Sequence, residues 1–121
     1  MLTNSDCTVY RYNTLTQGFD RLYIPQVAWL ECRAANVLKS GMQNADSVTI
    51  HISAKYAASA PQTAAKDMLV KGNCPFEFDN SSVQSISDSM KAFRAQYRFV
   101  TATSIDDYMY GGLPHIEVSA R

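Results

Sequence analysis

The chain has 121 residues, 46% of them apolar, and its eleven basic and eleven acidic side chains give a formal charge of zero. This length and composition predict one folded domain over residues 1–121 and exclude intrinsic disorder. DNA-binding proteins gather basic residues on one face or in one run, whereas the basic residues here are scattered, which disfavours direct DNA recognition. A near-neutral surface is compatible with self-association.

The three cysteines, Cys7, Cys32 and Cys74, are odd in number and widely spaced. This pattern predicts no disulfide framework and no Cys-x-x-Cys metal or redox motif. We expect reduced thiols, mostly buried as small apolar side chains, in a cytosolic product. The first residues do not resemble a signal peptide, and no stretch approaches the ~18 apolar residues of a membrane span, so we expect no membrane partner.

The first part of the chain predicts two strands joined by a turn. Residues 7–12 are rich in β-branched and aromatic side chains, and residues 13–18 form a polar stretch that ends in glycine. Residues 19–33 indicate an extended segment, because Pro25 inside a helix would cost about 3 kcal/mol. We expect this segment to bend at Pro25, at a sheet edge or a bulge.

Beyond the bend, strand alternation places Val27 and Trp29 on one face. Residues 34–45 predict a loop or a short turn of helix, because a serine and a glycine interrupt them. Residues 46–53 form the clearest strand, in which apolar and polar side chains alternate strictly. The alanine-rich residues 54–66 have few large apolar side chains, so we expect a long loop with little contact to the core.

The last part of the chain predicts one helix and three further strands. The strands are expected at residues 67–71, 97–105 and 115–119, and residues 106–112 predict a hairpin loop. In the last of these strands, alternation places Ile116 and Val118 on the inward face. Around residues 81–95, apolar side chains recur at the three- and four-residue steps of an amphipathic helix. These side chains are Val83, Ile86, Met90 and Phe93.

The order of these elements favours a mainly β fold. Strands that do not alternate regularly with helices disfavour a parallel α/β sheet. We therefore expect a β-barrel or a curled antiparallel sheet of six to seven strands, with one packed α-helix around residues 81–95.

No constellation for catalysis, cofactor binding or metal binding stands out. His51 and His115 fall on polar faces of predicted strands, with no acidic residue at a recognisable spacing, which favours solvated histidines. The pair Asp106 and Asp107 could hold a cation, but in a turn aspartates more often cap backbone amides. We therefore expect a protein without enzymatic activity, cofactor or metal.

The predicted hairpin tip offers large side chains for contact with a partner. Tyr108, Met109 and Tyr110 lie next to two glycines, and tyrosine and methionine are enriched in interface cores. The competing interpretation, given equal weight, is that this tip folds back over the end of the barrel.

Several segments, in order, resemble a family of small phage and prophage head–tail connector proteins of Gram-positive hosts. The opening resembles M-x-T-N-x-D-x-T-V-Y, and residues 23–29 resemble a strand that leads to V-x-W. Residues 41–52 resemble G-x-x-x-A-D-x-V-x-I-x-I, and residues 67–72 resemble D-x-I-V-K-G. Residues 111–115 resemble the closing hairpin of that family.

This resemblance implies a structural subunit of the head–tail junction, in a connector, head-completion or stopper ring of β-barrels. It implies self-association into a ring, other neck or tail proteins as partners, and proximity to DNA in the channel. It also implies a location in the host cytoplasm during assembly and then in the virion. The candidate contacts lie in the two expected loops and are Tyr56, Pro61, Asp107, Tyr108, Met109 and Tyr110.

Two alternatives stay open. A tail-completion or tail-terminator protein shares this size and architecture. A small enzyme could use a Cys–His pair, which requires one of the three cysteines to lie within hydrogen-bond reach of His51 or His115.

Overall fold

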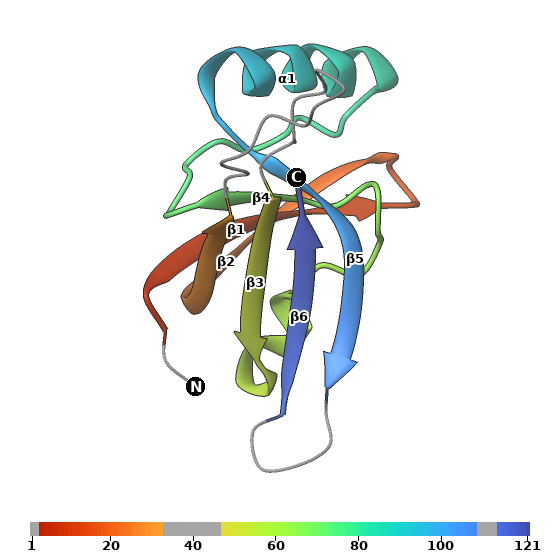
Figure 1. Ribbon diagram of the computed structural model, residues 1–121. Helices are drawn as coiled ribbons and strands as arrows, with labels where there is room; N and C mark the ends of the chain where they lie inside the picture. Colours follow the sequence, from red (N-terminus) through yellow and green to blue (C-terminus); the bar gives the residue numbers. More distant parts are fainter. Residues whose placement is uncertain (1–2, 33–46, 109–113) are drawn as a thin grey trace, which may run out of the picture.

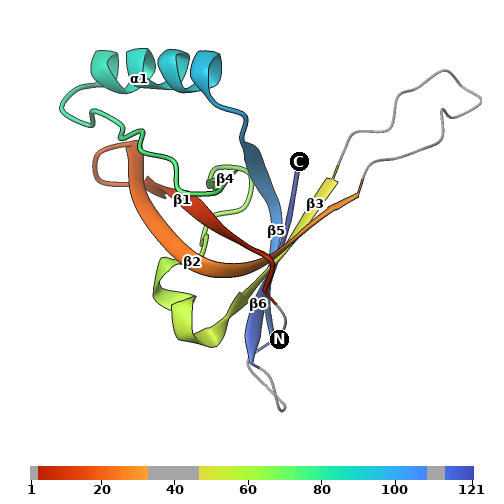
Figure 2. The same cartoon turned by 90° about the vertical axis from the view of Figure 1, so that its left-hand side faces the viewer.

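The computed structural model shows a closed antiparallel β-barrel with an α-helix packed on its outside (Figures 1 and 2). It describes residues 3–32, 47–108 and 114–121, apart from the side chain of Cys32. The elements are β1 (Ser5–Asn13), β2 (Gly18–Cys32), β3 (Ser47–Ser53), η1 (Ala54–Ser59), β4 (Met68–Lys71), α1 (Val83–Gln96), β5 (Val100–Tyr108) and β6 (His115–Ala120). The expected mainly β fold with one packed helix is confirmed for these residues.

The barrel combines two sets of three consecutive strands. β1, β2 and β3 are neighbours in one set, and β4, β5 and β6 are neighbours in the other. The sets join where β1 pairs with β4 and where β3 pairs with β6, and every pairing is antiparallel. The long strand β2 pairs first with β1 and then with β3, so it curves from one side of the barrel to the other (Figure 2).

The bend in β2 lies at the proline, as predicted. The β1–β2 register shifts by one residue between Ser5 and Cys7. Pro25 and Gln26 of β2 therefore lie opposite a single residue of β1, Asp6. A bulge of this kind bends a strand and accommodates a residue that lacks a backbone N–H.

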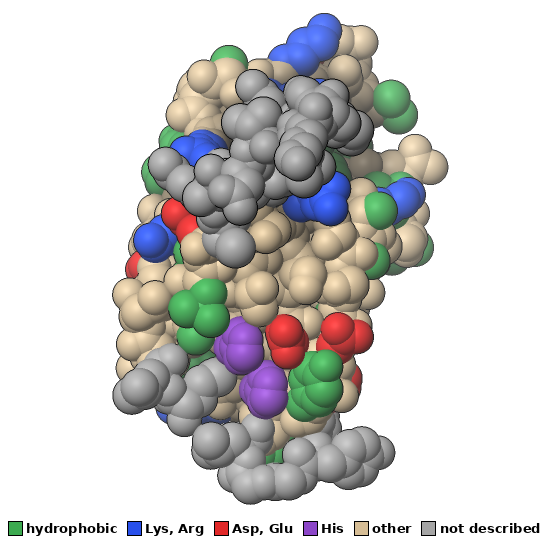
Figure 3. Space-filling view, in the orientation of Figure 1, with side chains coloured by type: hydrophobic (Ala, Val, Ile, Leu, Met, Phe, Trp, Pro, Cys, Tyr) green, Lys and Arg blue, Asp and Glu red, His purple; other side chains and the backbone are tan. Residues whose placement is uncertain are grey.

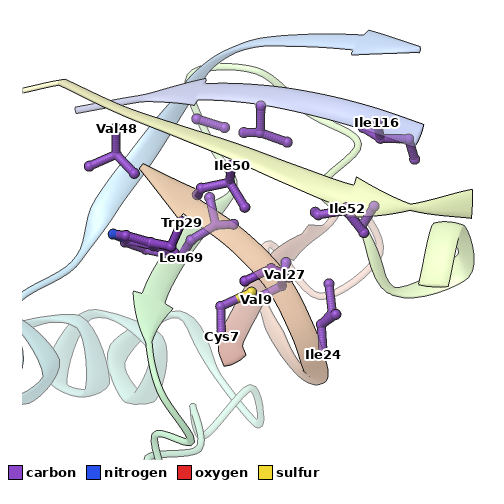
Figure 4. Close-up of a cluster of buried hydrophobic side chains, with 13 residues drawn as sticks. Cys7, Val9, Ile24, Val27, Trp29, Val48, Ile50, Ile52, Leu69 and Ile116 are labelled. Carbon is purple, nitrogen blue, oxygen red and sulfur yellow. The ribbon is translucent and has the colours of Figure 1, made fainter. Parts of the chain in front are cut away.

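The interior of the barrel is filled by alternate side chains of its strands (Figure 4). The expected pairs in β2 (Val27 and Trp29) and in β6 (Ile116 and Val118) are buried there. The other buried members of this interior cluster are Cys7, Val9, Ile24, Val48, Ile50, Ile52, Ala60, Leu69 and Ala102. Burial of each large aliphatic side chain contributes about 1.5–3 kcal/mol, so this cluster is a principal source of stability.

A second apolar cluster lies between α1 and the outer face of β1 and β4. Its buried members are Tyr10, Met68, Val70, Cys74, Phe78 and Phe93. Ser82 caps the helix by accepting a hydrogen bond from the Ser85 N–H, and the Phe93 ring lies 4.8 Å from that of Tyr10. Because β1 has apolar contacts on both faces, residues 7–10 are all buried.

The segment after β3 differs from the expected long loop with little core contact. Residues 54–59 form η1, a 3₁₀ helix, and the side chains of Tyr56 and Ala57 pack against the interior cluster. The expectation was wrong because small alanine side chains let the backbone of a tight turn approach the strands closely. η1 covers the end of the barrel at which β3 ends (Figure 1).

Arg11 of β1 holds η1 and the residue after it against the barrel through hydrogen bonds. Its Nη2 donates hydrogen bonds to the carbonyl oxygens of Ala58 and Ala60, at 2.5 and 2.9 Å. Charged donors make stronger hydrogen bonds than neutral ones, so this side chain ties η1 to the wall of the barrel.

Asp67 is a fully buried carboxylate where the two sets of strands meet. Its side chain accepts hydrogen bonds from the N–H groups of Tyr12, Gln62 and Thr63, at 2.8, 2.6 and 2.9 Å. Its own carbonyl oxygen accepts a hydrogen bond from the N–H of Ala102 at 2.9 Å. This one residue therefore connects β1, the segment before β4, and β5.

Replacement of Asp67 by alanine is expected to lower the free energy of unfolding by at least about 3 kcal/mol, because three backbone N–H groups lose their acceptor in a water-excluded place. Urea unfolding at equilibrium measures this change. Asp88→Ala is the matched control, since Asp88 is exposed and accepts a hydrogen bond from Gln84 on the surface of α1. Equal unfolding midpoints for the two variants would show that Asp67 does not stabilise the fold.

Candidate functional site

The outer face of β3, β6 and β5 brings both histidines of the chain together. The rings of His51 and His115 are parallel within 3°, with centroids 5.4 Å apart. The ring of Tyr108 stacks on His115 at 5.2 Å and 23°. We call these three residues the imidazole stack. Figure 3 shows the two histidines side by side in the lower half of this face, next to acidic side chains.

Two carboxylates lie beside the imidazole stack and form what we call the acidic pair. Asp106 of β5 is directly opposite Glu117 of β6, and His51 of β3 lies opposite Glu117 on the other side. The side chains of His51, Asp106 and Glu117 project outward. Ile116 and Val118, which flank Glu117 in β6, are buried in the barrel, and side chains alternate between the two faces of a strand. Like charges that face each other across two strands destabilise a sheet, so this pair favours a cationic partner.

A cavity of about 420 Å³ lies at the opposite end of the barrel, where β6 ends and β3 begins. Among the described residues, its charged lining consists of three cations, Lys71, Arg98 and Arg121, and one carboxylate, Glu31. The carboxylate accepts a hydrogen bond from Trp29 Nε1 at 3.2 Å. The remaining lining residues are mostly apolar and are Trp29, Ser47, Val48, Leu69, Phe99 and Val100. We call this feature the cationic cavity.

The described residues of the imidazole stack and the cationic cavity present aromatic and charged groups at the surface. Among the described residues, no group of three or more His, Cys, Asp or Glu side chains is placed to hold a metal ion. A search of the same residues finds no helix with the length and apolar character that crossing a membrane requires. Paired carboxylates, stacked rings and a cation-lined cavity together suit recognition of charged and aromatic groups on a partner.

The residues predicted as contacts fall in three different environments. Asp107 and Tyr108 are exposed, but they belong to β5 and not to the expected hairpin loop, because the strand continues three residues beyond Ile105. Tyr56 is half-buried in η1 and Pro61 is buried behind it. Met109 and Tyr110, the other two predicted contacts, lie outside the described residues. The contact role of these residues stays a prediction.

Sequence reasoning missed Glu117, Lys71, Arg98 and Arg121 as members of these surfaces. The alternation of residues 115–119 did place Glu117 and His115 on one face, and that was a usable signal. Which strands lie beside that face depends on long-range pairing, which local patterns do not specify.

Two of the cysteines occupy apolar surroundings. Cys7 lies in the interior cluster and Cys74 in the cluster beneath α1, and neither cluster includes a histidine. Burial, with a smaller contribution from the charge of Asp6, raises the pKa of the Cys7 thiol to about 12. This environment opposes formation of the thiolate that a Cys–His nucleophile requires.

The chain with Cys32→Ser and Cys74→Ala retains Cys7 as its one thiol, and we expect that thiol to resist a thiol-specific reagent at pH 8 until the protein unfolds. The reason is its full burial and raised pKa. Absorbance of the released thiolate measures the reaction. A chain lacking all three cysteines and carrying Ser87→Cys, at an exposed position of α1, is the reactive control. Equally fast modification in both folded chains would contradict the prediction.

Comparison of the chain with curated proteins gives no match, and comparison with solved structures gives none either. A family model, described as a family of unknown function, DUF6751, matches residues 2–121. The match runs through every strand of the barrel and through α1. The chain therefore belongs to the DUF6751 family.

Proposed function

We propose that this protein is a non-catalytic structural subunit of the head–tail junction of a tailed phage or prophage, within a connector or stopper ring. The main support for the proposal is the position in the fold of the segments that resemble head–tail connector proteins. The described residues of the segments that resemble small head–tail connector proteins lie in the barrel strands or directly beside them.

Two of these segments each contribute several side chains to the interior cluster. The V-x-W segment contributes Val27 and Trp29 of β2, which are buried side by side in the barrel. The V-x-I-x-I segment contributes Val48, Ile50 and Ile52 of β3, all of which face inward. A likeness at these positions is a likeness of core and strand register, so it supports a shared barrel architecture.

The D-x-I-V-K-G segment supports the same conclusion through backbone requirements. Its aspartate, Asp67, holds three backbone N–H groups. Its glycine, Gly72, has a φ of +91°, which L side chains rarely adopt. Thr8 Oγ1 donates a hydrogen bond to the Gly72 carbonyl at 2.9 Å and accepts one from the Cys74 N–H at 2.8 Å. The aspartate and the glycine of this segment therefore both have structural roles in the connection between β4 and β1. The likeness falls on positions that the barrel requires.

The surface suits assembly through side chains. A closed barrel offers no strand edge for pairing with another chain, so contacts must come from its outer faces, ends and turns.

The proposal predicts binding of the purified protein to DNA-filled, tailless capsids, measured by light scattering after size-exclusion chromatography. Co-elution with the capsids is the expected result, and an unrelated protein of similar size and zero formal charge serves as the control. Binding to isolated tails and not to capsids would favour the tail-completion alternative. Binding to neither particle would overturn the proposal.

A further inference from the structure

We propose that the outer face of the β5–β6 hairpin in one copy docks into the cationic cavity of a second copy, so that copies associate head to tail. The docking residues are the acidic pair, Asp106 and Glu117, with the ring of Tyr108. The inference rests on the proposed function and deepens it, because it names the contact between copies of the subunit.

The register of the described strands places no lysine or arginine beside the docking residues. Asp106 and Glu117 are directly opposite each other, which places their Cβ atoms about 4.5–5.5 Å apart. The register places His51 beside this pair on β3, and serines on the next row of β5 and β6. No lysine or arginine stands at any of these register positions in the described strands. A cationic group on a partner would therefore relieve the repulsion between the two carboxylates.

The cationic cavity has the complementary chemistry. Among its described lining residues it presents the cationic side chains Lys71, Arg98 and Arg121 and one carboxylate, Glu31. The rings and aliphatic groups in its wall can receive an aromatic side chain. Tyr108, which is 47% exposed, is an aromatic side chain next to the acidic pair.

The two surfaces cannot meet within one chain. His115, beside the docking residues, begins β6, and Arg121, in the wall of the cavity, follows the last residue of the same strand. An extended strand separates its two ends by about 3.3 Å per residue and holds them apart. The complementary surface must therefore come from another molecule, and the formal charge of zero leaves little long-range repulsion between copies.

Contact between two different surfaces of identical copies has a structural consequence. Such heterologous contacts produce a closed ring where the rotation between copies closes, and a filament where it does not. The geometry of the docking contact would then set the number of subunits.

A charge-swap experiment tests this contact by sedimentation velocity over a range of protein and salt concentrations. The wild-type chain is expected to associate, and the association to weaken as salt is added. The variants Asp106→Lys/Glu117→Lys and Lys71→Glu/Arg121→Glu are each expected to bind themselves at least tenfold more weakly. An equimolar mixture of the two variants is expected to regain association, because each lysine-bearing hairpin then meets a glutamate-bearing cavity.

The matched control is Glu77→Lys/Asp88→Lys. It makes the same charge change as Asp106→Lys/Glu117→Lys, at exposed positions away from both surfaces. This variant is expected to associate like the wild-type chain, and circular dichroism checks that all variants fold. Failure of the mixture to associate would overturn the docking contact, as would unchanged association of either charge-reversed variant. Wild-type binding to tailless capsids together with a failed charge swap would remove the docking contact and leave the proposed function standing.

Discussion

The fold depends on one buried carboxylate at the junction of two sets of strands. Asp67 ends the segment that leads from the first three strands to the last three, and its side chain bonds both the end of β1 and the segment before β4. Its backbone carbonyl bonds β5. A buried carboxylate is costly unless its oxygens accept hydrogen bonds, so Asp67 favours the arrangement in which β1, the segment before β4 and β5 meet at this point.

The position of α1 follows from the same closure. Pairing of β1 with β4 places Tyr10, Met68 and Val70 on the outside of the barrel, where they would otherwise meet water. The helix and the segment before it cover these side chains, and the hydroxyl of Tyr10 donates a hydrogen bond to the carbonyl oxygen of Phe76 at 2.7 Å. The barrel therefore has one covered wall, and its opposite wall, β3–β6–β5, carries the polar side chains available for recognition.

The direction of β6 determines where the polar wall and the cationic cavity lie. Its first residue belongs to the imidazole stack, its third to the acidic pair, and the residue after its end to the cavity. Neighbouring strands add the other members at positions that the antiparallel register sets. A six-residue strand thus separates surfaces of opposite charge on a chain whose formal charge is zero.

By itself the sequence determined the mainly β fold, the bend at Pro25, the inward faces of β3 and β6, and the helix, because period-two and period-3.6 patterns and proline geometry are local. The pattern of side chains did not predict the helix η1 or its contact with the core, since small side chains produce no periodic signal. Only the tertiary structure decided that His51, Glu117 and Asp106 share one row, and that Lys71 and Arg121 line one cavity. These groupings depend on strand pairing and barrel closure across long stretches of chain, which the local pattern of side chains does not encode.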